Sequence, residues 1–368
     1  MIVIDAAPID APIDAVYGDP WVDTDYPVRV RLTVNNPGVE ETLPDVPVLV
    51  VLSAAAIDYD IIDVDGHGVA FFDNAGVRLP HEIERWNPAG DSALWVRLPA
   101  IPASGDTSFW LYYGKPDATD ETNGSGVWSN EYRAVWHLAE ENLGSNHEDA
   151  SGNGSNTGSR VNNTVAPDGI DAIGRAQEFD GNSDHIAFGN VSGFRETDDT
   201  LTLLARVQAR SVNGDGIMNV IGSSSDSNSD GAWQLFWNDV SSENPNGWAG
   251  NVRVDSGDTE VVRSDSGALN SWQLLALTYD GVKVRLYVDG EEVSNEDQTG
   301  SIDSLIALRI GDNMIGSGDF DGYIDEVRVS GVARSASWLK VQHESLSQNL
   351  IEFGPTECLD GDCPGAGQ

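Results

Sequence analysis

The segment Asp180-Gly-Asn-Ser-Asp184 places oxygen-bearing side chains at alternate positions among residues that favour turns. Calcium takes about six to eight oxygen ligands from carboxylates, amide carbonyls and the backbone. Asp180, Asn182 and Asp184 could supply three of these ligands, so the segment predicts a Ca²⁺ site. The alternative is that Asp180 and Asp325 cap turns by accepting hydrogen bonds from backbone amides.

Asp325 and Glu326 are candidates for completing that site. Side chains two residues apart share one face of a strand, so Asp325 is expected to point in the same direction as Val327 and Val329. An inward carboxylate is costly unless it is paired or binds a metal. Since the chain has only 20 basic residues, cationic partners are scarce. We therefore predict metal ligation by Asp325, with Glu326 on the opposite face of the strand.

Three tryptophans are candidates for ligand binding. Sugars bind aromatic rings through their apolar faces and add a few hydrogen bonds, in shallow sites. Trp233 and Trp237 share a strand face, and Trp248 follows the turn-like segment Asn244-Pro-Asn-Gly247. The alternative is that these rings pack in a core, which is the more usual place for Trp233 and Trp237.

The two cysteines, Cys358 and Cys363, flank the turn-like pair Asp360-Gly361 near the end of the chain. This spacing could close a small disulfide loop in an oxidising compartment. The alternative is a metal site with two thiolates, which lacks further Cys or His nearby. We therefore predict a disulfide between Cys358 and Cys363.

Motifs for catalysis are missing from the sequence. His81-Glu82 is followed by Arg85 where a zinc protease needs a second histidine, and no Gly-x-Ser-x-Gly segment occurs. The six histidines show no metal-ligand spacing, and no glycine-rich phosphate loop is present. The sequence therefore favours a chain that is not an enzyme.

The charge of the chain excludes several partners. Acidic residues number 60 against 20 basic ones, which gives a formal net charge of −40. Such a field repels phosphate backbones and anionic lipid surfaces, so neither nucleic acid nor an anionic membrane is an expected partner. No apolar run reaches the roughly 18 residues of a membrane span. Strong acidity together with few lysines is typical of proteins from saline habitats, where salt screens self-repulsion.

Alternation of apolar and polar residues predicts strands along most of the chain. The clearest case is Val282–Val288, which lies between Asp280-Gly281 and Asp289-Gly290. Asp-Gly favours two-residue hairpin turns, so this strand should pair on both sides. Helical periodicity is weak, and its best candidate is Ser335–Ser347. Many short strands separated by Gly, Asn and Asp indicate an all-β class made of sandwiches.

Composition divides the chain into segments. The repeated Pro-Ile-Asp-Ala unit at the start predicts a flexible stalk, and the polar stretch after Tyr113 predicts a linker. The predicted segments are a stalk at 1–18, a first domain at 19–114, a linker at 115–130, a second domain at 131–354 and a tail with the disulfide loop at 355–368.

Six motifs follow one another in the second domain, at Ala134–Leu138, Asp149–Gly154, Gln177–Ile186, Trp272–Gly290, Gly322–Ser330 and Ala333–Trp338. In their sequence and order they resemble a LamG-type, concanavalin A-like jelly roll. The resemblance implies that the turn at Asp180 faces the closing strand that contains Asp325 and Glu326.

The first domain contains four characteristic segments, at Val46–Leu52, Leu79–Trp86, Leu94–Leu98 and Phe109–Gly114. They resemble the family called domain of unknown function 2341, which often precedes such jelly rolls. That family implies a β-sandwich and carries no chemistry over to this chain.

These observations together predict a non-catalytic module at the cell surface or outside the cell, although no signal peptide is visible. The expected partner is a glycan or glycoprotein, with Ca²⁺ ordering the rim loops. The alternatives are a structural or adhesin spacer that mediates protein–protein contact, and an accessory module of a carbohydrate-active enzyme. The sequence leaves the oligomeric state open.

Overall fold

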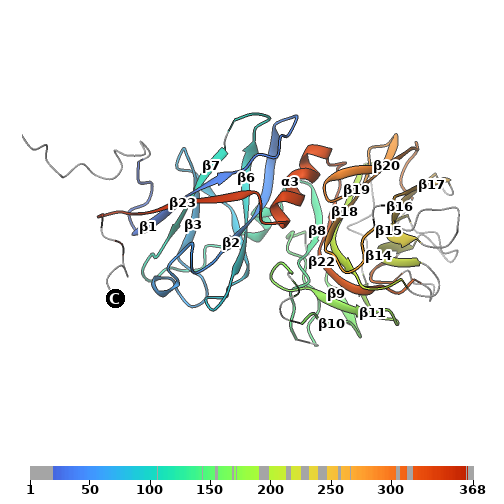
Figure 1. Cartoon of the computed structure of the whole chain (residues 1–368), viewed down its shortest axis with the longest axis horizontal. Helices are drawn as coiled ribbons and strands as arrows, with labels where there is room; N and C mark the ends of the chain where they lie inside the picture. Colours follow the sequence, from blue (N-terminus) through green and yellow to red (C-terminus); the bar gives the residue numbers. More distant parts are fainter. Residues whose placement is uncertain are drawn as a thin grey trace, which may run out of the picture.

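The computed structural model shows two β-sandwiches with a helix between them (Figure 1). It describes residues 20–105, 107–142, 144–153, 156–167, 170, 172–189, 199–212, 217–224, 232–238, 247–255, 258–265, 267–303, 307–312, 318–361 and 363. The predicted stalk lies outside the described residues. The all-β prediction is confirmed, since strands dominate and only two short α-helices occur within the described ranges. In the same ranges no helix has the length and apolar character needed to cross a membrane.

The first sandwich consists of a five-stranded and a three-stranded antiparallel sheet. The five-stranded sheet has the order β23 (Ile351–Cys358), β1 (Val28–Val34), β7 (Thr107–Tyr113), β3 (Val69–Asp73) and β4 (Arg78–Leu79). The three-stranded sheet has the order β2 (Leu43–Leu52), β6 (Ser92–Ile101) and β5 (His81–Arg85). A 3₁₀ turn, η1 (Tyr59–Ile61), follows β2.

The first domain is completed by the end of the chain. After crossing the second domain, the chain returns as β23, which pairs antiparallel with β1 from Val34↔Ile351 to Val28↔Cys358 (Figure 1). The boundary predicted at residue 354 therefore falls inside a strand of the first domain, and residues 355–358 are strand rather than tail. Pairing between segments so far apart in sequence leaves no local signal, which is why composition missed it.

The second domain is a sandwich of two larger sheets. The eight-stranded sheet has the order β10 (Thr164–Val165), β11 (Gln177–Asp180), β22 (Asp321–Ser330), β13 (Leu201–Ala209), β18 (Gln273–Tyr279), β19 (Lys283–Val288) and β20 (Glu291–Asp297), with β8 (Tyr132–Trp136) also paired to β22. The seven-stranded sheet has the order β17 (Asp258–Arg263), β16 (Gly247–Val254), β15 (Trp233–Asn238), β14 (Ile217–Ser224), β21 (Ala307–Ile310), β12 (His185–Phe188) and β9 (Gly158–Val161).

The predicted hairpins around β19 are confirmed. This strand pairs antiparallel with β18 on one side and β20 on the other. Gly281, Asp289 and Gly290 have positive φ angles, as tight hairpin turns require. Inward residues of both sheets form one apolar core between them, which includes Leu203, Leu277 and Leu286.

The helix α3 (Ala336–Leu346) lies between the two sandwiches (Figure 1). The Ser335 side chain caps its first turn by accepting from the backbone N–H of Trp338. Trp338 and Leu339 belong to the same apolar cluster as Leu204 and Tyr287, which face outward from the eight-stranded sheet. The first domain and α3 therefore cover the outer face of that sheet.

The predicted linker also contributes to this contact. It contains the short helix α2 (Gly124–Val127), and Trp128 at its end is fully buried. The two domains are thus held together by packed side chains in addition to the connecting chain.

Candidate functional site

The predicted calcium turn joins the two sheets of the jelly roll, between the end of β11 and the start of β12. Asp180 Oδ1 accepts from the backbone N–H of Asn182 at 2.9 Å, and Asp184 Oδ2 accepts from the backbone N–H of Asp180 at 3.0 Å. Asp180 and Asn182 are exposed, whereas Asp184 is buried. Burial, with the nearby Asp180 and Asp319 carboxylates, raises the pKa of Asp184 to about 6. Asp180 therefore caps the turn, as the alternative interpretation expected, and Asp184 accepts from the backbone of the same turn.

The structure does not bring the five predicted calcium ligands together. Asp180 stands opposite Asp321 in the β11–β22 ladder, and Asp325 lies four residues further along β22. At about 3.3 Å per residue this separation is on the order of 13 Å, too far for one ion. Asp325 and Glu326 belong instead to the contact between the domains.

A β-bulge explains the misplacement of Asp325. Leu204 of β13 pairs with Arg328 and Arg206 pairs with Asp325, so Glu326 and Val327 both stand opposite one residue. Glu326 takes the positive φ angle of 52° that the extra residue needs. Val327 consequently faces the core, while Asp325, Glu326 and Arg328 lie on the outer face. The prediction that Asp325 shares a face with Val327 is wrong for this reason.

A group of charged side chains fills the contact between the domains. We call it the junction cluster; it consists of Glu82, Glu84, His137, Arg206, Asp325, Glu326 and Arg328. His137 Nδ1 lies 2.6 Å from Glu326 Oε1 and 3.5 Å from Glu84 Oε2. The Trp95 indole N–H donates to Glu84 at 2.8 Å, and the Trp128 indole N–H donates to Glu82 at 2.6 Å.

Arg328 is the best-anchored member of the junction cluster. Its guanidinium lies between Trp95 and Trp128, 4.3 and 4.7 Å from the ring centroids. It pairs with Glu326 and donates to Gln342 of α3 at 2.8 Å. Gln342 in turn donates to the carbonyl of Pro47 in the first domain at 3.0 Å. One fully buried cation therefore connects both sandwiches and the helix.

The buried charges shift one another's pKa values. Burial, reinforced by the Glu326 carboxylate, raises the pKa of Glu84 and of Asp325 well above the usual range. Burial opposes ionisation of Glu326 as well, but the positive charges of His137 and Arg328 lower its pKa to about 2. The surrounding carboxylates raise the pKa of His137 although burial opposes this. No local sequence pattern indicates this cluster, because its members come from two different domains.

The three predicted ligand-binding tryptophans lie in the core of the jelly roll. The exposed fractions of Trp233, Trp237 and Trp248 are 0%, 4% and 0%. Trp248 is not in a loop: it pairs with Trp237 across β15 and β16, with ring centroids 4.9 Å apart. A sugar cannot stack on these rings from solvent, so the predicted platform is wrong and the core alternative is correct.

The opposite face of the same strands carries polar side chains. We call it the amide face; its members are Asn219, Gln234, Phe236, Asn251, Arg253 and Arg309 on β14, β15, β16 and β21. They alternate with core residues such as Leu235 and Val252, so they point away from the core. Gln234, Arg253 and Arg309 are half-buried and reach solvent. The period-two pattern around Trp233 already contained this signal, since Gln234 and Phe236 occupy the positions between core residues.

Asn219 has the most unusual environment on the amide face. It is 1% exposed, yet neither polar atom of its side-chain amide has a hydrogen-bond partner. Phe236 stands opposite it in the ladder. A Cβ at Gly222 would lie 2.9 Å from Asn219 Nδ2, so this glycine leaves room for the amide. Asn251 Oδ1 is also buried without a partner. Buried amides normally bond, so these atoms indicate groups that a ligand could satisfy.

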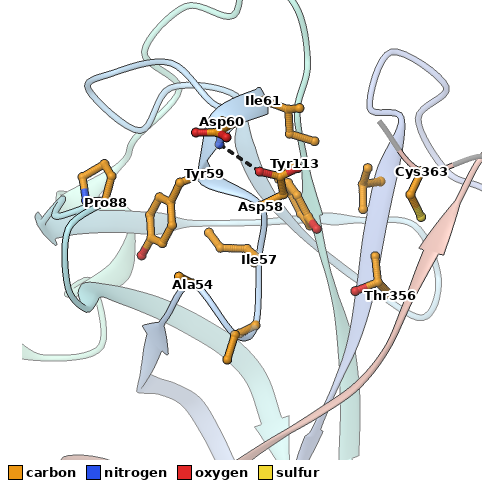
Figure 2. Close-up of a pocket in the computed structure, with 13 residues that line it drawn as sticks. Ala54, Ile57, Asp58, Tyr59, Asp60, Ile61, Pro88, Tyr113, Thr356 and Cys363 are labelled. Atoms are coloured by element: carbon orange, nitrogen blue, oxygen red, sulfur yellow. Dashed lines mark hydrogen bonds between the residues drawn. The ribbon is translucent and has the colours of Figure 1, made fainter. Parts of the chain in front are cut away.

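The first domain contains a surface pocket of about 540 Å³ beside η1 (Figure 2). Its walls are mainly apolar and include Ile57, Tyr59, Ile61, Pro88 and Tyr113. The Asp58 carboxylate accepts from the backbone N–H of Asp60 at 3.0 Å, so it caps η1. The pocket therefore offers apolar surface without a free constellation of catalytic groups among the described residues.

The predicted disulfide is confirmed. Cys358 and Cys363 are joined at the end of β23, and Cys363 lines the same pocket (Figure 2). The bond closes the loop that follows the last strand of the first domain.

Structural comparison matches parts of this chain to solved structures of low sequence identity. The binding domain of Paraclostridial Mosquitocidal Protein 1 is 12% identical with a TM-score of 0.45, and the match covers 58% of this chain and 52% of that one. Domain 4 of AbnA, an extracellular GH43 arabinanase from Geobacillus stearothermophilus, is 17% identical with a TM-score of 0.42 and coverage of 57% and 97%. A pentraxin from Limulus polyphemus is 15% identical with a TM-score of 0.36 and coverage of 44% and 78%. The chain thus spans about half the length of the mosquitocidal protein chain.

No curated protein matches this chain. Family models match one segment in each half of the chain. Residues 65–158 match the domain of unknown function DUF2341, and residues 180–340 match Laminin_G_3 of the concanavalin A-like lectin/glucanases superfamily. Both matches occur in the order that the sequence motifs predicted. The chain therefore carries a DUF2341 domain followed by a Laminin_G_3 domain of the concanavalin A-like superfamily.

Proposed function

We propose that this chain is a non-catalytic module, extracellular or at the cell surface, that binds a glycan or glycoprotein through the amide face. The observation that carries the proposal is Asn219, whose buried amide lacks partners for both of its polar atoms. A side-chain amide both donates and accepts, so two sugar hydroxyls would satisfy both atoms once the groups that leave Asn219 only 1% exposed move aside.

Other members of the amide face support the same kind of ligand. Phe236 provides apolar surface next to the Asn219 amide, which suits the CH faces of a sugar ring. Gln234 and Asn251 stand opposite each other and add further amide groups. Few polar groups at fixed positions around an apolar patch are typical of small-ligand sites.

A calcium ion at the turn Asp180–Asp184 is the second part of the proposal. Asp184 supplies a buried carboxylate, and Asp319 lies near enough to influence its pKa. Asp319 thus takes the place that Asp325 held in the sequence prediction. Extracellular calcium modules bind the ion with dissociation constants of about 10⁻⁴ to 10⁻³ M. The ion would order the rim between the two sheets of the jelly roll.

We propose that the chain does not hydrolyse glycans, because of where its buried acidic side chains lie. A glycosidase needs two carboxyl groups about 5 to 9 Å apart on either side of a bound sugar. The side chains of Glu84 and Glu326 are at most 1% exposed and lie between the domains, where no sugar can reach them. An extracellular location is supported by the Cys358–Cys363 disulfide, because such bonds persist in oxidising compartments.

A glycan array tests the proposed binding. The wild-type chain, Asn219→Ala and the control Asn295→Ala are compared; Asn295 is an exposed asparagine on β20 of the other sheet. We expect the wild type and the control to retain the same glycans, and Asn219→Ala to bind them at least tenfold more weakly. Equal binding by all three proteins, each with an unchanged melting temperature, would contradict the site. No retained glycan at all would favour a structural spacer.

Chelation tests the calcium ion separately. We expect EDTA to lower the melting temperature of the wild type, and Asp184→Asn to remove this sensitivity. An EDTA response that persists in the variant would place the ion elsewhere.

A further inference from the structure

Three polar atoms of the junction cluster are buried without a hydrogen-bond partner. They are Glu84 Oε1, His137 Nε2 and Asp325 Oδ1. The Glu84 and Asp325 side chains are 1% and 0% exposed. Orphaned polar atoms are rare in native interiors and each raises the question of a missing partner. Two of these atoms, Glu84 Oε1 and Asp325 Oδ1, are carboxylate oxygens from the first and the second domain, whereas His137 Nε2 lies 3.5 Å from Glu82 Oε2. The atoms that face one another in the cluster are others: His137 Nδ1, Glu84 Oε2 and Glu326 Oε1.

The same cluster has an unbalanced formal charge. It contains the four carboxylates of Glu82, Glu84, Asp325 and Glu326, but only the two guanidinium groups of Arg206 and Arg328. In the form that binds a metal, with all four carboxyl groups ionised and a neutral imidazole at His137, the formal charge is −2, and burying such an excess is costly. One divalent cation would balance it.

We propose that the junction cluster binds one divalent transition-metal ion of the zinc class, with Glu84, His137 and Glu326 as its ligands. One ligand atom from each of these residues lies within 4.8 Å of the other two. Ligands of a tetrahedral ion with bonds of about 2.1 Å are about 3.4 Å apart. The 3.5 Å separation of His137 Nδ1 and Glu84 Oε2 already matches this spacing. The 2.6 Å contact between His137 and Glu326 needs to open by about 1 Å.

The donor set selects the class of metal. An imidazole together with carboxylates suits zinc and similar transition metals, whereas calcium prefers oxygen ligands alone. The junction site therefore differs from the proposed calcium turn in both ligand chemistry and burial. It also lies behind the eight-stranded sheet, away from the amide face, so the metal proposal does not depend on glycan binding.

Protonation of buried carboxyl groups is the alternative way to remove the excess negative charge. In a metal-free chain the Glu84 carboxyl would hold a proton because burial and its neighbours raise its pKa. Glu84→Gln separates the two solutions, since glutamine resembles a protonated carboxyl and still accepts from Trp95, but is a poor metal ligand. If protonation removes the excess charge, Glu84→Gln is expected to leave the stability of the chain unchanged.

The experiment refolds the full chain in the presence of Zn²⁺, removes loose metal by desalting and measures bound zinc by mass spectrometry. Asp63, Asp65 and His67 form an exposed group that could hold zinc adventitiously. All proteins therefore carry His67→Ala. We expect one zinc per chain with Glu84 intact and at least fivefold less in Glu84→Gln. A zinc-free parent chain, or equal zinc in both proteins, would overturn the proposal.

Refolding with Co²⁺ gives a second readout that does not depend on the Glu84 variant folding. We expect the parent chain to show the strong visible absorption of four- or five-coordinate Co²⁺ bound to nitrogen and oxygen. A spectrum of hydrated Co²⁺ alone would contradict a closed site at the junction.

Discussion

The two outer faces of the jelly roll are built by the same strand alternation and are used differently. The eight-stranded sheet turns Arg206 and Arg328 outward, where they pair with Asp325 and Glu326 of the same sheet, and Trp95 of the first domain packs on Arg328. The seven-stranded sheet turns Asn219 and Gln234 outward, and the first domain does not pack on them. On one face the charged side chains contact one another within the chain, whereas on the other face the Asn219 amide has no partner for either of its polar atoms.

This difference follows from what each kind of group needs. A buried charge requires a permanent counter-charge, because leaving it alone costs several kcal/mol, on the order of 3–5. A neutral amide without a partner costs less, about 1–3 kcal/mol, so a folded chain can carry it until a ligand arrives. We therefore interpret the charged face as an assembly surface and the amide face as a recognition surface.

The largest expected effect tests the assembly surface. Arg328→Ala leaves the Glu326 carboxylate buried without its guanidinium and empties the space between Trp95 and Trp128. We expect it to lower the free energy of unfolding in urea by about 3–5 kcal/mol. The control is Arg285→Ala on the same sheet, whose ion pair with Asp280 is partly exposed and should contribute under about 1 kcal/mol. Similar losses in both variants would refute the distinction.

A buried histidine in the first domain should make the unfolding free energy sensitive to acid. His81 is 2% exposed and its ring lies tilted against Phe71, and burial lowers its pKa to about 4. The unfolded chain takes up this proton near pH 6.5, so the contribution of His81 to the unfolding free energy should fall as pH drops from about 6.5 to 4. The loss reaches up to about 3 kcal/mol. His81→Phe should flatten this part of the pH profile, and an unchanged slope would show that other groups cause it.

A smaller effect of opposite sign is expected on the recognition surface. Asn219→Leu replaces an amide without partners by an apolar group of similar size, so it should raise the unfolding free energy by about 1 kcal/mol. The matched control is Asn163, which is equally buried but donates to Gln177 at 3.1 Å. Asn163→Leu should destabilise the chain by about 1–3 kcal/mol. Destabilisation by both changes would mean that Asn219 is satisfied in the folded chain.

The smallest expected effect is general rather than local. With a net charge of −40, self-repulsion should weaken as salt is added, so the melting temperature should rise with NaCl concentration. A flat response would remove the argument for adaptation to a saline habitat.

The local parts of the fold were predictable from the sequence. Asp-Gly pairs located the hairpins around β19, and cysteine spacing located the Cys358–Cys363 disulfide. The face to which each side chain of β22 points was not predictable, because a bulge at Glu326 has no sequence signature when the residue is not glycine. Nor was the burial of Trp248, since the turn-like residues before it suggested a loop. The junction cluster depends on contacts between domains, which no local pattern encodes.

Hydrogen–deuterium exchange with the strongest glycan from the array tests the central claim most directly. We predict that the glycan slows exchange in peptides that contain β14, β15 and β16, and leaves peptides from β13 and β22 unchanged. Protection confined to the junction, to the first-domain pocket or to the turn at Asp180 would contradict the assignment of recognition to the amide face.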